Sequence, residues 1–157
     1  MNLECPVLQS GRLIPNRFAF RGVPGGQNLS LPLRWSGCPE GTRSYLLTII
    51  DRHPVANNWV HWLLVNIPST CTQLSEGVSS RDQLPEGSVQ LRNSFGELGY
   101  GGPKPPRGSG PHEYVVTLHA LSVAQLSVSE GMAYAELMRM VEQDVLATAR
   151  VVGVFEQ

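Results

Sequence analysis

Lysine is almost absent from this sequence, and charge of either sign is scarce. Charged residues make up 16% of the 157 positions, the formal net charge is −1, and the single lysine is Lys104. Proteins that bind nucleic acid by neutralising its phosphates need a basic excess, so the composition argues against a nucleic-acid partner. No run of Lys or Arg indicates a patch for a membrane surface either.

Long apolar runs and paired cysteines are also missing. No stretch approaches the roughly 18 apolar residues of a membrane-spanning helix, so we expect no integral membrane segment. The N-terminus lacks a basic start followed by an apolar run, which predicts a cytoplasmic location, although a processed secreted protein would begin in the same way. Cys5, Cys38 and Cys71 are odd in number and lack C-x-x-C spacing. We therefore expect free thiols in a reducing compartment, with one disulfide and a spare thiol as the alternative.

Glycine and proline, by contrast, are abundant and divide the chain into short segments. The 16 glycines and 12 prolines are typical of a β-rich fold with many turns, and the length suits one domain covering residues 1–157. Near-continuous apolar runs predict strands that are buried on both faces. The strongest runs are Ser44–Ile50, Trp59–Ile67 and Tyr114–Leu121, and the weaker ones are Val151–Phe155, Leu31–Trp35 and Phe18–Arg21.

One helix is predicted near residues 130–147. Tyr134, Leu137 and Val141 lie at helical spacing and would form its apolar face. Ser127 and Glu130 have the S-x-x-E spacing of a capping box, which predicts where the helix begins.

The segment Gly96–Pro111 is rich in glycine and proline and cannot form a helix or a central strand. Strong strands flank it, so we interpret it as a structured functional loop rather than a disordered linker. Within it, Gly108-Ser109-Gly110 is the nearest match to a nucleophile elbow, but it lacks the strand–turn–helix context. We interpret it as a turn, find no catalytic nucleophile, and do not expect an enzyme.

Polar residues stand at the ends of the predicted strands. Asp51 follows the first strand, His61 lies inside the second, and His112 and Tyr114 open the third, where they share a face. If the fold joins these strand ends, they form an anion pocket in which Asp51 orients an imidazole and backbone N–H groups of the loop contact the anion. Spacing alone does not establish this, and a core histidine bonded to a backbone carbonyl explains His61 equally well.

Other roles for the histidines receive less support from the pattern. Histidines together with Asp51 can serve as metal ligands, but H-E-x-x-H and H-x-H motifs are missing, so we expect neither a metal nor a cofactor. His119 lies on the opposite face of its strand from His112, and we expect it to have no role in the site.

Two motifs, in this order and separation, resemble the phosphatidylethanolamine-binding protein family in its bacterial Raf-kinase-inhibitor-like branch. They are the Asp51–Pro54 turn followed by W-V-H-W-L-L-V-N at 59–66, and P-P-R-G-S-G-P-H-E-Y at 105–114. The resemblance implies a β-sandwich-like fold of two antiparallel sheets with a few peripheral helices, and a small pocket for phosphate, phosphorylated headgroups or similar anions. By position, the ligand-binding residues would be Asp51, His53, Pro54, Trp59, His61, Pro105, Pro106, Gly108, His112 and Tyr114.

One departure from the family changes the expectation for this pocket. The family turn usually reads D-P-D-A-P, whereas this chain has the shorter D-R-H-P, with Arg52 and His53 near the place of the second carboxylate. We expect a more positive pocket that prefers a doubly charged phosphate over a zwitterionic headgroup. The resemblance also makes the bond between His53 and Pro54 a candidate for a cis peptide.

Three functions remain open at this point. The first is a regulatory or inhibitory module that binds a small anionic or phosphorylated ligand. The second is a protein-interaction or kinase/protease-inhibitor-like module with a vestigial pocket, and the third is a weak histidine-dependent hydrolase. The branch that the sequence resembles also makes a homodimer conceivable.

Overall fold

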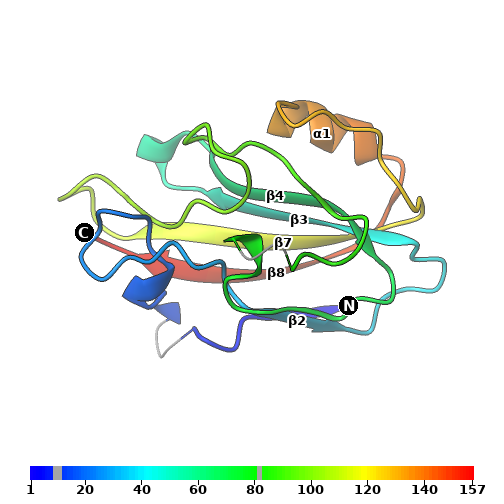
Figure 1. The fold of residues 1–157 in the computed structure, drawn as a ribbon, viewed down its shortest axis with the longest axis horizontal. Helices are drawn as coiled ribbons and strands as arrows, with labels where there is room; N and C mark the ends of the chain where they lie inside the picture. The colour runs from blue at the N-terminus through cyan, green and yellow to red at the C-terminus, as the bar shows by residue number, and fades with distance from the viewer. Residues whose placement is uncertain (9–11, 81–82) are drawn as a thin grey trace.

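The computed structural model describes residues 1–8, 12–80 and 83–157. Within these ranges the chain forms two antiparallel sheets with peripheral helices (Figure 1), which confirms the predicted fold class. The larger sheet has the order β6 (Val89–Gln90), β4 (Trp59–Pro68), β3 (Ser44–Asp51), β7 (His112–Leu121), β8 (Val145–Phe155). The smaller has the order β1 (Asn2–Glu4), β2 (Leu33–Ser36), β5 (Gln73–Leu74). Helix α1 spans Tyr134–Val141, and short 3₁₀ helices span Asn16–Phe18, Pro54–Ala56 and Val78–Ser80.

The central strands of the larger sheet are buried on both faces, because one face packs against the smaller sheet and the other packs under α1. All eight residues of β3 are buried, as its apolar sequence predicts. Alternate residues divide between the two cores: Ile49 packs with Leu33 of β2, whereas Leu46 packs with Leu137 of α1. Full burial of each such side chain contributes roughly 1.5–3 kcal/mol.

The three strong strand predictions correspond to β3, β4 and β7, and the weaker ones have different outcomes. Leu31–Trp35 overlaps β2, and Val151–Phe155 is the second half of the longer β8. The prediction of a strand at Phe18–Arg21 is wrong, because a 3₁₀ helix ends at Phe18 and the chain after it follows the glycine- and proline-rich loop. There the Phe20 N–H donates to the Pro103 carbonyl at 2.9 Å.

The predicted helix exists, but it is shorter at both ends. Ser127 and Glu130 precede it and form no capping box, because the Glu130 carbonyl accepts from the Arg92 N–H at 2.7 Å and the chain turns before α1 begins. At the other end, Val145 already belongs to β8 and pairs with Leu121 of β7. The tertiary partner of this segment therefore overrides its helical periodicity.

The Gly96–Pro111 segment is an ordered loop held by hydrogen bonds to distant parts of the chain. The Gly102 N–H donates to Asn28 Oδ1 at 2.7 Å, and Gln157 Nε2 donates to the Pro105 carbonyl at 2.7 Å. A Cβ on Gly102 would lie 2.1 Å from the Phe18 carbonyl oxygen, so only glycine permits this close approach. The interpretation of this loop as structured is confirmed.

All three cysteines are free thiols, as predicted. Cys5 is buried, and burial raises the pKa of its thiol to about 11, which keeps it protonated and unreactive near neutral pH. Within the described ranges, no helix has both the length and the apolar composition that crossing a membrane requires.

Candidate functional site

Three predicted strand ends meet because β3 runs antiparallel to both of its neighbours. The C-terminal end of β3 therefore lies beside the beginnings of β4 and β7. Asp51 pairs with Trp59 on one side and with Tyr114 on the other. His112, two residues before Tyr114, lies on the same face of the sheet as Tyr114. The fold thus joins the segments that the pocket hypothesis needs.

A β-bulge in β4 positions His61. Ile50 pairs with Val60 and Ile49 pairs with Trp62, so His61 has no partner of its own on β3. The His61 ring meets the Tyr114 ring edge-to-face, with centroids 5.0 Å apart. Trp62, the next residue, packs with Tyr114 in the core between the two sheets.

Gly101 of the loop fixes the orientation of the buried His61 ring. His61 Nδ1 lies 2.6 Å from the Gly101 carbonyl oxygen, which can only accept, so Nδ1 carries the hydrogen. Burial lowers the pKa of His61 to about 4, so the ring is neutral near pH 7 and Nε2 holds a lone pair. The alternative of a histidine bonded to a backbone carbonyl is therefore correct for Nδ1, while Nε2 makes no hydrogen bond to the described residues.

Both ring nitrogens of His112 have hydrogen-bond partners within the protein. Nδ1 lies 2.6 Å from Asp51 Oδ2, and Nε2 lies 2.9 Å from Ser109 Oγ. Ser109 Oγ also donates to the Pro106 carbonyl at 2.6 Å. Asp51 Oδ1 accepts the His53 N–H at 2.9 Å, so both carboxylate oxygens are used. Of His61 and His112, only His61 has a ring nitrogen without a hydrogen bond to the described residues.

His53 lies against this pair. Its ring stacks on that of His112, with centroids 3.9 Å apart, and its Nδ1 accepts the Val55 N–H at 3.3 Å. The bond before Pro54, a candidate for a cis peptide, is trans, since the described residues contain no cis peptide. The 3₁₀ helix that begins at Pro54 continues from a trans bond.

Arg52, which the sequence places near the pocket, does not line the cavity. Its guanidinium is directed away from the cavity and donates to Asn58 Oδ1 at 2.6 Å and to the Tyr134 hydroxyl at 3.3 Å. Arg52 follows Asp51 directly in the chain, and alternation along the strand directs it toward the α1 side. The side chain of Lys104, from the loop, lines the cavity, and its Nζ lies over the Phe20 ring, 5.5 Å from the ring centroid.

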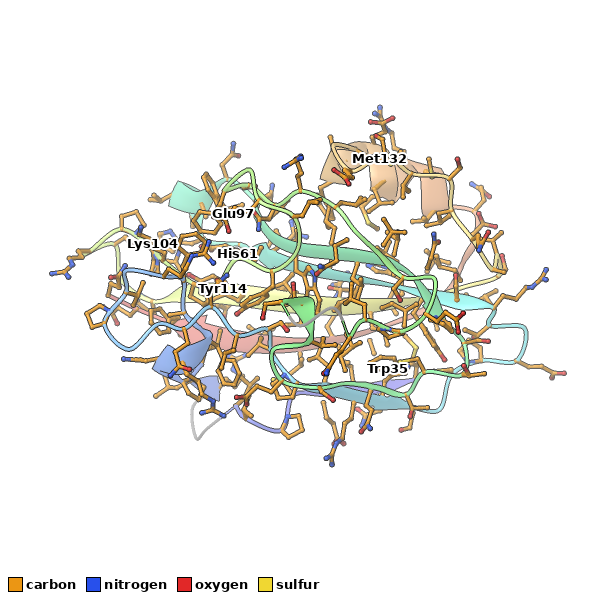
Figure 2. All side chains as sticks on the ribbon, in the orientation of Figure 1. Trp35, His61, Glu97, Lys104, Tyr114 and Met132 are labelled. Atoms are coloured by element: carbon orange, nitrogen blue, oxygen red, sulfur yellow. The ribbon has the colours of Figure 1, made fainter. Side chains whose placement is uncertain are left out.

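A cavity of about 340 Å³ opens beside these residues. Figure 2 shows His61, Tyr114 and Lys104 near one end of the larger sheet, far from Trp35 and Met132. The cavity is lined by Asp51, Val55, Ala56, Trp59, His61, Phe95, Lys104, Pro105, Pro106 and His112. Of the predicted site residues, His53, Pro54, Gly108 and Tyr114 lie outside this lining.

Tyr114 and Gly108 have structural positions around the site. The Tyr114 hydroxyl is buried and has no hydrogen-bond partner among the described residues. Burial, and then the charge of Asp51, raise the pKa of Tyr114 above its usual value. The Gly108 N–H donates to the Gln157 carbonyl at 3.2 Å and the Ser109 N–H to Pro106 at 3.2 Å. These two loop donors are therefore not free for an anion.

Sequence reasoning missed Lys104, Phe95 and Ser109. Lys104 is the one lysine of the chain and lies within the loop predicted to be functional, which is the signal that could have identified it. Phe95 contributes an apolar wall, and the Trp59 ring meets it edge-on with centroids 5.3 Å apart. Ser109 does lie in a turn, as interpreted, but its contact with His112 depends on the fold of that turn.

Comparisons with known proteins find relatives of the same fold. The family model described as Phosphatidylethanolamine-binding protein matches residues 5–156. The UPF0098 protein YbcL of Escherichia coli K12 is 41% identical over 142 residues, covering 88% of this chain and 77% of that protein. The crystal structure of YbcL, described as a new member of the mammalian PEBP family, matches with a TM-score of 0.90 at 36% identity, covering 99% and 98% of the two chains.

Two further relatives match nearly the whole chain. The UPF0098 protein YbhB of E. coli K12 is 36% identical over 158 residues, covering 99% of each chain. A Mycobacterium tuberculosis protein named lipoprotein LppC is 33% identical, covering 99% of this chain and 72% of its own length. Because one relative is named as a lipoprotein, the cytoplasmic location stays a prediction from the sequence.

Proposed function

This chain belongs to the phosphatidylethanolamine-binding protein family, and on that premise we propose that it binds a small anionic or phosphorylated ligand in the cavity beside His61. It acts as a regulatory or inhibitory binding module rather than as an enzyme. One observation carries the proposal: the side chains of His61 and Lys104 line the same cavity, whose other walls are largely apolar, and Nε2 of His61 makes no hydrogen bond to the described residues. Such a combination of apolar walls with a few polar groups is typical of small-molecule sites.

The charge distribution favours an anion of modest size. Lys104 is the cation among the described lining residues, and the carboxylate of Asp51 is engaged by His112 and by the His53 N–H. The rings of Trp59 and Phe95 give the cavity an apolar wall, and an apolar surrounding strengthens the attraction between a cation and a bound anion. A volume of about 340 Å³ lies at the lower end of the range for ligand pockets, which suits a headgroup-sized ligand.

The test is an NMR titration of the protein with inorganic phosphate and with phosphoethanolamine, following the ring signals of His61 and His112. We expect saturable shifts of the His61 signals at millimolar ligand. Lys104→Met should weaken binding, whereas Arg107→Met, an equal change of charge three residues along the same loop, should not, because Arg107 does not line this cavity. Absence of any shift at about 10 mM of either ligand would reject the proposal.

A hydrolase is the second candidate, because Ser109, His112 and Asp51 form a hydrogen-bonded series. Ser109 Oγ, His112 Nε2, His112 Nδ1 and Asp51 Oδ2 are linked at 2.9 and 2.6 Å, as a nucleophile, its base and an orienting carboxylate would be. In this scheme His112 takes the Ser109 proton as Oγ attacks an ester carbonyl, and returns it to the leaving alcohol. Water then releases the acyl group from Ser109 as an acid.

The binding role is favoured because the Ser109 hydroxyl donates to the Pro106 carbonyl at 2.6 Å, which holds its proton away from His112. Ser109 also does not line the cavity. Hydrolysis of p-nitrophenyl acetate by the wild type and by Ser109→Ala decides between the two. Turnover that disappears in Ser109→Ala would establish the hydrolase, and equal rates would remove it.

A further inference from the structure

The backbone of Gly101 determines which hydrogen-bonding group His61 offers to a ligand. The Gly101 carbonyl accepts from Nδ1–H at 2.6 Å, and the Gly101 N–H donates to the His61 carbonyl at 2.8 Å. A ring held in this way cannot exchange its two nitrogens by a simple flip without breaking the bond to Gly101. Nε2, the ring nitrogen without a protein partner, is therefore an acceptor in the neutral ring.

An acceptor bordering an anion site restricts the ligand. A fully deprotonated oxygen brings only lone pairs and forms no hydrogen bond with Nε2. His112 does not compensate, because Asp51 and Ser109 already engage both of its nitrogens. A ligand that fits must bring its own donor to His61 and negative charge to Lys104.

We propose that the cavity binds a phosphate or phosphomonoester as the monoanion, whose remaining O–H donates to Nε2 of His61 while Lys104 faces its single negative charge. This inference rests on the proposed function and deepens it by specifying the protonation state of the ligand. It replaces the expectation, drawn from the D-R-H-P turn, that a doubly charged phosphate is preferred.

The groups that face His61 are compatible with an acceptor role for Nε2. They are Asp51 from β3, His112 and Tyr114 from β7, and Tyr100 and Lys104 from the loop. Burial raises the pKa values of Tyr100 and Tyr114, so neither contributes a negative charge near neutral pH. The pKa of His61 is about 4 because burial outweighs the bond to Gly101 and the charge of Asp51, which keeps Nε2 unprotonated.

Methyl phosphate and methyl sulfate provide a matched pair of probes. At about pH 5 both carry one negative charge and have nearly the same shape, but only methyl phosphate retains an O–H, since its second pKa is about 6. We expect calorimetry on the wild-type protein to show methyl phosphate binding about tenfold or more tightly than methyl sulfate at that pH, a difference equivalent to a net hydrogen bond. Between about pH 5 and pH 7.5 the affinity for methyl phosphate should fall, while that for methyl sulfate changes little.

Each other outcome has a defined meaning. Equal affinities for the two probes at about pH 5 would overturn the donor requirement while leaving anion binding intact. Affinities that rise together on acidification would indicate that His61 itself becomes protonated, which also overturns the inference. Binding of neither probe at about 10 mM would remove the proposed function itself. Lys104→Met serves as the control, since it should weaken both probes to the same extent.

Discussion

Gly101 holds His61 by both of its backbone polar groups, accepting from the ring at 2.6 Å and donating to the carbonyl of the same residue at 2.8 Å. The two residues are 40 positions apart and belong to a loop and a strand. This relationship sets the protonated nitrogen of His61, and hence the character of the cavity that we propose as the ligand site.

Gly101→Ala should disturb this arrangement. An added Cβ would lie 2.6 Å from Phe95 Cδ2, so the phenyl ring that lines the cavity must move. We expect a loss of roughly 1–3 kcal/mol in the free energy of unfolding, measured with urea, and weaker binding of phosphate. Gly131→Ala is the control, since nothing lies within 4 Å of its Cβ position. Equal stability of the two variants would show that Phe95 adapts without strain.

Asp51→Asn should destabilise the protein, because one amide oxygen cannot replace two carboxylate acceptors. Asp51 Oδ2 accepts from His112 and Oδ1 accepts the His53 N–H, and the side chain is buried. We expect a decrease of roughly 1–3 kcal/mol in unfolding free energy and a change in the His112 ring signals by NMR. If the His112 signals stay unchanged in the variant, Asp51 does not orient that ring.

His119→Leu should leave stability unchanged or increase it. His119 is buried on the face opposite to the cavity, and neither of its ring nitrogens has a hydrogen-bond partner among the described residues. Replacing unsatisfied nitrogens by an apolar group of similar size removes a penalty of roughly 1–3 kcal/mol. His61→Leu gives the opposite case, because it removes the donor to Gly101. The melting temperature of His119→Leu should therefore be well above that of His61→Leu. The reverse order would contradict the unsatisfied state of His119 and the stabilising bond between His61 and Gly101.

The free energy of unfolding should decrease as the pH is lowered below about 6.5, the ordinary histidine pKa. Burial lowers the pKa values of His61 and His119 to about 4, so between these limits the unfolded chain binds more protons than the folded protein. The stabilisation is complete above the unfolded pKa and is lost as the pH falls toward the folded pKa. For His61 the loss amounts to roughly 3 kcal/mol. Urea unfolding at pH values across this range measures the slope, which should be shallower in His119→Leu.

The apolar segments of this sequence determined the strands β3, β4 and β7. Their near-continuous hydrophobic runs reflect burial on both faces, a local property that periodicity records directly. The motifs around Asp51, His61 and His112 likewise identified the family, because they carry unusual residue types in a specific order. Segments with weaker patterns were misjudged where a distant partner dominates, as at Phe18–Arg21 and at both ends of α1.

Only the tertiary structure decided what these residues can do. The bulge at His61, the bond of its ring to Gly101, and the turn of Arg52 toward Tyr134 depend on strand register and on contacts between segments far apart in the chain. The loop folds over the end of the sheet. This fold places Asp51 and Ser109 within hydrogen-bonding distance of the two ring nitrogens of His112, and it places Lys104 in the lining of the cavity. A sequence specifies which groups are present, but hydrogen-bond partners and side-chain directions are set by packing that no local pattern contains.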